Sequence, residues 1–357
     1  MSVLGAGGVL RRSHAAGLAG LAALLLLLLA TRAPVPPPPQ PRPLRLPTPS
    51  STHIDKQPHS QTSPAPSEAS SHPSPKTTKS VNTTGVVLVR DVYEAGHERP
   101  HPELCPSLGA KLRLLILVTS APSHSSARDA VRLTWGHYAA RKDIALAFVL
   151  GAPPASLRAA VEAEDALYGD LIVGRSIDSY SNLTLKTISM LEWADTYCPR
   201  APRLLKTDDD MFINIPRLLS FTAARANATK TIWGKVVKKS LPKRTTKSKY
   251  YVSPLQFPGR VFPDFATGPA YLLTADAARL LLAAAPSERY LRLEDVFITG
   301  VLAAKLGLAR SHAAEFYNKK VAPHPCAVQR GIAIHMVQYH EQFDLWRKLL
   351  DGKTKCR

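Results

Sequence analysis

The stretch Arg113-Leu-Leu-Ile-Leu-Val-Thr-Ser120 is a continuous aliphatic run. It predicts a β-strand that is buried on both faces, as in a parallel sheet covered by helices. Ser125 or Ser126 can cap a helix that follows this strand and ends near Gly136. A buried strand followed by a helix is the first indication of an α/β fold.

The alternation of strands and helices continues to the end of the chain. We expect further strands at 144–150, 171–173, 203–206, 231–237 and 331–336. We expect helices from Pro153, over 181–197, from Pro216, and over 275–285, 296–306 and 341–350. This order predicts a mostly parallel α/β sheet, in which functional sites collect at the carboxyl ends of the strands.

The N-terminal region differs from the rest of the chain in composition. Sixteen uninterrupted apolar or glycine residues run from Ala15 to Ala30, shortly after Arg11 and Arg12. The pattern predicts an uncleaved membrane anchor at 13–31, with a cytosolic tail at 1–12 and the remaining chain in the lumen of the secretory pathway. A cleaved signal peptide is the alternative, because it also combines a basic segment with an apolar run.

Proline, charge and cysteine content fit this topology. Fourteen of the 31 prolines lie in residues 34–80, so we expect a disordered, Pro/Ser/Thr-rich stem over 32–107. The formal charge of +19 suggests a polyanionic partner, but a lumenal location argues against nucleic acid. Asn82, Asn182 and Asn227 begin N-glycosylation sequons. Four lumenal cysteines, Cys105, Cys198, Cys326 and Cys356, predict at least one disulfide and leave the pairing open.

Three adjacent carboxylates follow the strand at 203–206, in Lys206-Thr-Asp208-Asp209-Asp210-Met-Phe212. They would repel one another in a partly buried place unless a cation neutralised them, so a divalent metal bridged to phosphate is one interpretation. In extended backbone Asp208 and Asp210 point to the same side and Asp209 to the other. The alternative is a solvated acidic turn that caps the helix at Pro216.

Three other sets of residues could carry chemistry. Arg128 and Arg132 lie on one face of the helix after the first strand, where they could hold a nucleotide phosphate or simply face water. Glu294 and Asp295 precede a helix, either as a general base or as ordinary complements of the helix dipole. His335 lies in an apolar strand, as a core residue or a third metal ligand.

Five motifs occur in register: Arg128-x3-Arg132-x-Thr134-Trp135, Asp178-Ser-Tyr-Ser-Asn182-Leu-Thr-Leu-Lys186-Thr, Lys206-Thr-Asp-Asp-Asp210-Met-Phe, Phe262-Pro-Asp-Phe265-x2-Gly268-x2-Tyr271 and Glu294-Asp295-Val296. Together, behind a short anchor and a stem, they resemble the β1,3-galactosyltransferase and β1,3-N-acetylglucosaminyltransferase family of the Golgi, glycosyltransferase family 31. The resemblance covers roughly residues 112–350.

The resemblance implies a type II Golgi membrane enzyme with one GT-A domain at 108–357, a UDP-sugar donor, Mn²⁺ and inversion at the anomeric carbon. UDP-galactose would be transferred in β1,3 linkage to a glycan acceptor, with UDP-GlcNAc as the alternative donor and a non-catalytic glycan-binding relative as a second alternative. The implied roles are a base for Asp295; metal binding for Asp210, Asp208 and His335; nucleotide-sugar binding for Arg128, Arg132, Asp178, Lys186, Asp208 and Asp209; and a sugar pocket of Trp233, Gly268, Tyr271 and Glu294.

Two features depart from the family pattern. Ala266-Thr-Gly268-Pro-Ala-Tyr271 stands where relatives commonly carry Cys-Ser-Gly-x-Gly-Tyr, so one cysteine is missing and Pro269 stiffens the turn. The segment 235–249 holds seven Lys and Arg residues and no acid. It is either a solvated loop or a contact for an acidic acceptor or a membrane surface.

Overall fold

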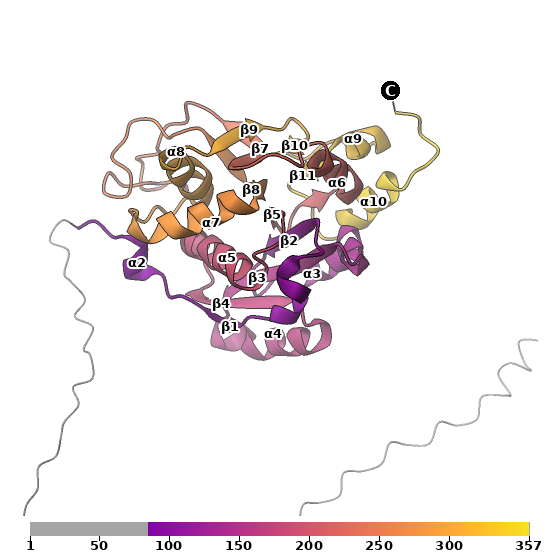
Figure 1. Ribbon diagram of the computed structural model, residues 1–357, viewed down its shortest axis with the longest axis horizontal. Coiled ribbons are helices and arrows are strands. Elements are labelled where there is room, and N and C mark those ends of the chain that lie inside the picture. Colours follow the sequence, from indigo (N-terminus) through magenta and orange to yellow (C-terminus); the bar gives the residue numbers. More distant parts are fainter. Residues whose placement is uncertain (1–84, 357) are drawn as a thin grey trace, which may run out of the picture. The chain divides into compact units, whose positions relative to one another are not determined.

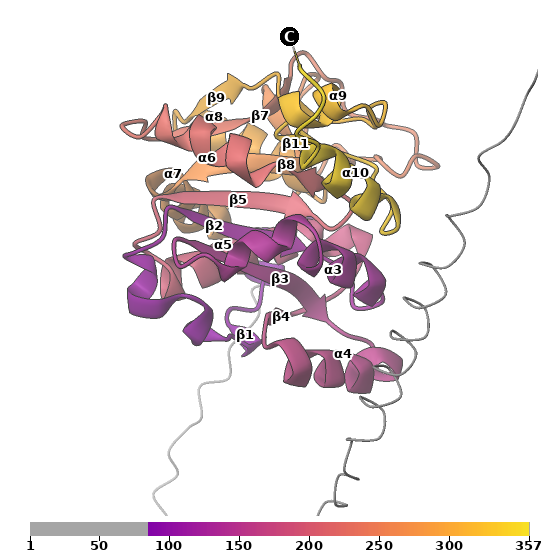
Figure 2. The same ribbon diagram turned by 90° about the vertical axis from the view of Figure 1, so that its right-hand side faces the viewer.

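The computed structural model describes residues 85–356, and a mixed eight-stranded sheet runs through its centre (Figures 1 and 2). Its strand order is β1-β4-β3-β2-β5-β8-β7-β9. In chain order the strands are β1 (His97–Arg99), β2 (Leu114–Thr119), β3 (Ile144–Ala152), β4 (Leu171–Ile177), β5 (Arg203–Asp208), β7 (Thr231–Val237), β8 (Phe265–Thr274) and β9 (Ala309–His312).

Helices cover both faces of this sheet (Figure 2). One face packs against α5 (Leu183–Tyr197), α7 (Ala275–Ala284) and the π-helix η6 (Val296–Leu302). The other packs against α3 (Ser125–Arg132), α4 (Ala155–Tyr168), α6 (Ile215–Ala223) and α10 (Glu341–Leu349). The remaining helices are α2 (Val89–Val92), α8 (Ala303–Lys305), α9 (Pro325–Arg330) and 3₁₀ turns at Pro102–Leu104, Pro106–Gly109, Trp135–Ala140, Tyr180–Asn182 and Ala285–Ser287.

The strand predicted at 113–120 is confirmed as β2, at the middle of the sheet. Every residue of β2 is buried. Leu115 and Leu117 pack on one face, whereas Leu114, Ile116 and Val118 pack on the other. Burial on both faces explains why its sequence is continuously aliphatic rather than alternating.

The sheet is mixed, which corrects the expectation of a mostly parallel one. β4, β3, β2 and β5 run parallel, but β8 is antiparallel to both β5 and β7, and β1 is antiparallel to β4. β8 was not expected, because the sequence Gly268-Pro269 is typical of a turn. In the structure this dipeptide lies where the ladder with β7 is irregular, between the pairs of Gly234 and Val236.

A second, three-stranded sheet has the order β10-β11-β6. Its strands are β6 (Phe212–Ile213), β10 (Phe316–Tyr317) and β11 (Ala333–Ile334), so the strand predicted at 331–336 is shorter than expected. The antiparallel pair of Ile334 with Phe212 brings the residue after β11, His335, beside the acidic turn before β6.

Residues 85–107 belong to the folded unit, which corrects the expected stem boundary at 107. Val89 is fully buried, β1 adds to the sheet beside β4, and Cys105 forms a disulfide with Cys198 at the end of α5. A segment that pairs with a sheet edge and is cross-linked to a core helix is not a disordered spacer. The expected tail, anchor, remaining stem and Asn82 lie outside the described residues.

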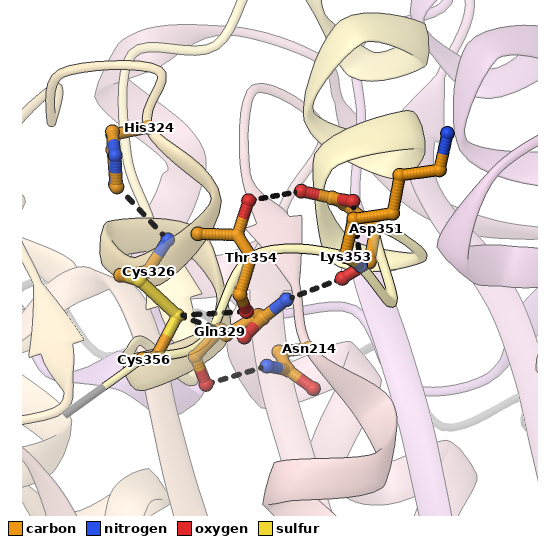
Figure 3. Close-up of a disulfide and its surroundings, with 8 residues drawn as sticks. All are labelled: Asn214, His324, Cys326, Gln329, Asp351, Lys353, Thr354 and Cys356. Atoms are coloured by element: carbon orange, nitrogen blue, oxygen red, sulfur yellow. Dashed lines mark hydrogen bonds between the residues drawn. A yellow bond between two sulfur atoms is a disulfide. The ribbon is translucent and has the colours of Figure 1, made fainter.

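Both disulfides join the expected cysteines and resolve the pairing. Cys326 in α9 binds Cys356 near the end of the chain (Figure 3). Around this bond, Gln329 donates to the carbonyl of Asp351, and the Asn214 amide donates to the carbonyl of Gln329. The C-terminal segment is thus attached to the start of α6. Within residues 85–356 no helix combines the length and the apolar composition needed to cross a membrane.

Candidate active site at the carboxyl edge of the sheet

Several of the predicted site residues lie where β2, β3 and β5 end, among them Asp178, Lys186 and Asp208. Ser120, Gly151 and Asp208 stand at or next to these carboxyl ends. Since β8 runs antiparallel to β5, its first half lies at the same edge, and Thr207 pairs with Ala270. Gly268 therefore lies next to the acidic turn at 208–210. In open α/β sheets, ligands bind at the carboxyl ends of the strands, where these residues lie.

Lys206 connects the acidic turn to β8. Its ammonium lies 2.5 Å from Asp208 Oδ1 and donates to the carbonyl of Gly268 at 2.7 Å. Asp208 also accepts from the Thr119 hydroxyl at 2.6 Å. Burial would lower the pKa of Lys206, but the charges of Asp208, Glu294 and Asp295 outweigh burial and raise it. One buried cation thus stabilises three carboxylates.

Asp295 lies on the other side of Gly268. Its Oδ2 accepts from the Gly268 backbone N–H at 3.1 Å, and its Oδ1 accepts from Val296 N–H at the start of η6. Burial raises the pKa of Asp295, and the backbone hydrogen bonds oppose that rise. An oriented carboxylate with a raised pKa is a suitable general base.

Glu294 precedes Asp295 in the chain and is held by Tyr271. Its Oε1 accepts from the Tyr271 hydroxyl at 2.5 Å, and the side chain is buried. Burial raises the pKa of Glu294 to about 7. Tyr271 itself is fully buried. It therefore positions Glu294 and does not line a sugar pocket, which corrects its expected role.

Asp210 and His335 lie together, as the metal prediction requires. His335 Nε2 is 3.3 Å from Asp210 Oδ2, while Asp210 Oδ1 is buried and has no hydrogen-bond partner among the described residues. An orphaned carboxylate oxygen beside an imidazole fits a divalent cation. Asp208 is turned instead toward Lys206 and Thr119, and residues 85–356 contain no cluster of three or more His, Cys, Asp or Glu arranged to hold a metal.

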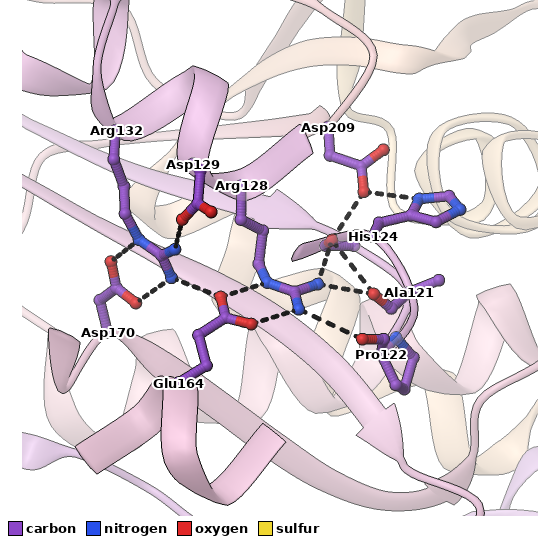
Figure 4. A network of polar contacts seen from close by, with 10 residues as sticks. Ala121, Pro122, His124, Arg128, Asp129, Arg132, Glu164, Asp170 and Asp209 are labelled. Atoms are coloured by element: carbon purple, nitrogen blue, oxygen red, sulfur yellow. Dashed lines mark hydrogen bonds and ion pairs between the residues drawn. The ribbon is translucent and has the colours of Figure 1, made fainter. Parts of the chain in front are cut away.

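Asp209 is turned toward the loop between β2 and α3 (Figure 4). Its Oδ2 accepts from the Ser120 hydroxyl at 2.6 Å and lies 2.9 Å from His124 Nδ1. The hydrogen bond that the His124 ring donates to Asp209 is the main cause of the raised pKa of His124. Asp209 therefore ties the end of β5 to the loop between β2 and α3.

Arg128, in α3, holds this loop (Figure 4). Its guanidinium is completely buried, bonds both oxygens of Glu164, and donates to Ser120 Oγ and to the carbonyls of Ala121 and Pro122. These five contacts use its entire donor set. The expected direct contact with a nucleotide phosphate is not what this structure shows.

Arg132 is likewise committed within the protein. Two of its nitrogens bond the two oxygens of Asp170, and it also contacts Asp129 and Glu164. Its guanidinium stacks 3.9 Å from the centroid of Tyr168. Arg128 thus positions the loop at 120–124, and Arg132 joins α3 to α4 and to Asp170 after it.

Asp178 and Lys186 form a buried ion pair at 2.6 Å. Asp178 accepts from Gly151 N–H at 2.7 Å, and Lys186 donates to the carbonyl of Ser120 at 2.7 Å. A Cβ at Gly151 would lie 2.7 Å from the carbonyl oxygen of Ser176, so only glycine allows this approach. The pair fixes the ends of β2 and β3 relative to each other.

The other predicted residues divide between core and surface. Trp233 is buried against Phe221 and the Arg203 guanidinium, which corrects its assignment to the sugar pocket. Asn227 is exposed, in keeping with a glycosylation site. Asn182 is partly exposed, but the Thr184 hydroxyl of its sequon is buried and donates to the Leu291 carbonyl.

Two residues of the site were not expected from the sequence: Lys206 as a site residue, and Glu164 as the partner of both arginines. For Lys206, the signal was a lysine at the end of the predicted strand Arg203-Leu-Leu-Lys206. A lysine in a strand buried on both faces requires a carboxylate partner. Glu164 gave no comparable signal, because Glu162 and Asp165 beside it are equally plausible partners for an arginine.

The sequence of this chain is similar to those of known proteins. A family model described as Galactosyltransferase matches residues 126–314. The chain is 35% identical over 247 residues to rat beta-1,3-galactosyltransferase 4, covering 60% of this chain and 66% of that protein. It is 33% identical over 245 residues to mouse beta-1,3-galactosyltransferase 1, covering 67% of this chain and 74% of that protein.

A third relative is human N-acetyllactosaminide beta-1,3-N-acetylglucosaminyltransferase 4, 31% identical over 255 residues, covering 68% of this chain and 66% of that protein. Among solved structures, a glycosyltransferase involved in the glycosylation of the major capsid of PBCV-1 aligns with a TM-score of 0.37 at 10% identity, over 66% of this chain and 98% of that one. By the family model and these identities, the chain belongs to the galactosyltransferase family.

Proposed function

We propose that the protein is an inverting hexosyltransferase that transfers galactose from UDP-galactose to a 3-hydroxyl of a glycan, forming a β1,3 linkage. The observation that carries this proposal is the connection of two carboxylate groups through β8. Asp208 is joined by Lys206 to the carbonyl of Gly268, whose N–H is bonded to Asp295. The backbone of Gly268 thereby connects Asp208, at the proposed donor-binding edge, with Asp295, the proposed base.

The residues of the chain have distinct parts in the transfer. Asp295 takes the proton from the acceptor hydroxyl as its oxygen forms a bond to the anomeric carbon. The bond from that carbon to the diphosphate breaks on the opposite face, and UDP leaves with the electron pair. One displacement of this kind inverts the anomeric centre and needs no covalent nucleophile. The Gly268 and Val296 N–H groups keep the base in place.

Asp210 and His335 would hold Mn²⁺, which is the cation that the family resemblance implies. When bound, such an ion acts as a Lewis acid that neutralises charge on the diphosphate. Asp210 Oδ1 is available for this role because it has no other partner in the described residues. Asp209, Arg128, Arg132, Asp178 and Lys186 act by fixing the loops that surround the donor.

The proposal includes a location in the Golgi membrane, as a single-pass type II protein with this domain in the lumen. The apolar run at 15–30, the sequons and two disulfides support that location. UDP-GlcNAc is the second candidate donor, because a relative at 31% identity is named as a β1,3-N-acetylglucosaminyltransferase.

A donor-by-acceptor panel tests the proposal. The full chain is incubated in detergent with Mn²⁺, with UDP-galactose or UDP-GlcNAc, and with neutral and anionic oligosaccharides. We expect a β1,3-linked product with one donor strongly preferred. Absence of transfer and of UDP-sugar hydrolysis across the panel would favour a non-catalytic glycan-binding protein instead.

A further inference from the structure

The basic segment 235–249 is not a freely solvated loop. Arg244 donates to the carbonyls of Val252, Phe257 and Gly259, and Val252 is fully buried. Lys243 and Tyr251 form an isolated β-bridge. The tip of the loop, which carries Lys247, Lys249 and Tyr250, is therefore held in one place.

Electrostatic interactions link this tip to the candidate base. Burial raises the pKa of the Tyr180 phenol, and the charges of Tyr250 and Asp295 raise it further. The charges of Lys249 and Arg292 act on the same phenol in the opposite direction. Arg292 also precedes Asp295 by only three residues in the chain.

Two hydrogen bonds fix the position of Arg292 relative to Tyr180. The Tyr290 hydroxyl donates to the Ser181 carbonyl at 2.5 Å, and the Thr184 hydroxyl donates to the Leu291 carbonyl at 2.7 Å. The Arg292 guanidinium lies 5.9 Å from the Tyr180 ring centroid, and the Lys249 ammonium lies 4.9 Å from that of Tyr250. Both tyrosines are about half exposed.

Neither cation has an anionic partner within the described part of the chain. Within residues 85–356, Lys249 and Arg292 form no ion pair, and Arg292 Nε is buried without a hydrogen-bond partner. An unpaired buried guanidinium nitrogen is unfavourable in the free protein and becomes favourable when an anion binds. Aromatic side chains beside such cations provide contact area for a ligand.

We propose that Tyr180, Lys249, Tyr250 and Arg292 form an acceptor subsite that binds an anionic sugar, a carboxylate- or sulfate-bearing residue adjacent to the sugar whose hydroxyl is deprotonated by Asp295. This inference rests on the proposed function, because it places the subsite on the acceptor side of the base. It gives the basic segment a defined role: complementary charge that selects among acceptors.

The test compares a neutral oligosaccharide acceptor with the same oligosaccharide carrying one sulfate or one uronic acid. We expect the full chain to favour the anionic acceptor in kcat/KM. Lys249→Gln and Arg292→Gln should each reduce that preference by roughly tenfold, through KM rather than kcat. Lys142→Gln and Arg200→Gln remove exposed charges at the opposite edge of the sheet and should keep the preference.

Each other outcome has a separate meaning. Equal use of both acceptors by the unmodified chain overturns the subsite and leaves the proposed transferase activity intact, whereas no transfer to either overturns the proposed function. Weaker binding of UDP alone by the two variants would assign the cations to the donor. An effect seen only with acceptors on phosphatidylserine vesicles would assign them to a lipid surface.

Discussion

The ammonium of Lys206 lies 2.5 Å from Asp208 Oδ1 and 2.7 Å from the carbonyl oxygen of Gly268. The lysine is fully buried, so its charge is compensated by neighbouring carboxylates and not by water. Because Gly268 N–H bonds Asp295, the same contact determines where the candidate base sits relative to the acidic turn.

Lys206→Met should therefore destabilise the protein strongly. The change leaves Asp208, Glu294 and Asp295 without their shared counter-ion, a loss of roughly 3–5 kcal/mol in the free energy of unfolding for a broken buried pair. Urea unfolding followed by fluorescence measures it, with Lys142→Met as the control for loss of an exposed lysine. Equal stability of the two variants would show that Lys206 does not hold these carboxylates.

Asp295→Asn should keep the fold and lose transfer. The asparagine oxygen can still accept from Gly268 or Val296 N–H, but the amide cannot take a proton, so kcat should fall roughly 100- to 10,000-fold. The matched control is Asp195→Asn, an exposed position in α5. Unchanged kcat with normal thermal stability would remove Asp295 from the role of base.

Glu294→Gln should change how stability depends on pH. Burial raises the Glu294 pKa from 4.5 to about 7, so the folded state holds a proton that the unfolded state releases. At roughly 1.4 kcal/mol per pH unit, this costs the folded state about 3 kcal/mol above pH 7 and nothing below pH 4.

The glutamine keeps an acceptor for Tyr271 and has no proton to lose. Relative to the unmodified chain, its melting temperature should therefore rise more at pH 8 than at pH 5. Melting curves at the two pH values measure this difference. The same shift at both would mean that Glu294 is ionised in the folded protein throughout this range.

Arg128→Lys should lower stability with little direct effect on donor affinity. Lysine cannot reproduce the paired bonds to Glu164 or reach Ser120, Ala121 and Pro122 together, so we expect a loss of roughly 3 kcal/mol. Urea unfolding and UDP titration of the folded fraction separate the two effects. A large rise in the Kd for UDP at unchanged stability would instead support the direct phosphate contact that the sequence predicts for Arg128.

The sequence predicted the parts of the fold that depend on local pattern. β2 and β3 are aliphatic because they are buried on both faces, and α5 begins and ends within two residues of expectation. β8 was missed because Gly268-Pro269 resembles a turn, and pairing with β5 and β7 overrides that local signal. β1 was missed because it is short, polar and stabilised by contacts with distant residues.

The site was predictable in composition but not in contacts. Spacing indicated that Asp208 and Asp210 would point to the same side, but Asp208 contacts Lys206 and Thr119 whereas Asp210 lies beside His335. The strand ends at Asp208, so its alternation does not continue to Asp210. Spacing could not indicate that Glu164 and Asp170, on a different helix and the loop after it, would use the charges of Arg128 and Arg132. Whether an arginine faces a ligand or a carboxylate is decided by tertiary packing.

The stereochemistry of the product tests the central claim most directly. The full chain is supplied with UDP-galactose, Mn²⁺ and an oligosaccharide that it accepts, and the new linkage is determined by NMR. The displacement assisted by Asp295 predicts β-linked galactose on a 3-hydroxyl. An α-linked product, which requires retention of the donor's configuration, would contradict the account.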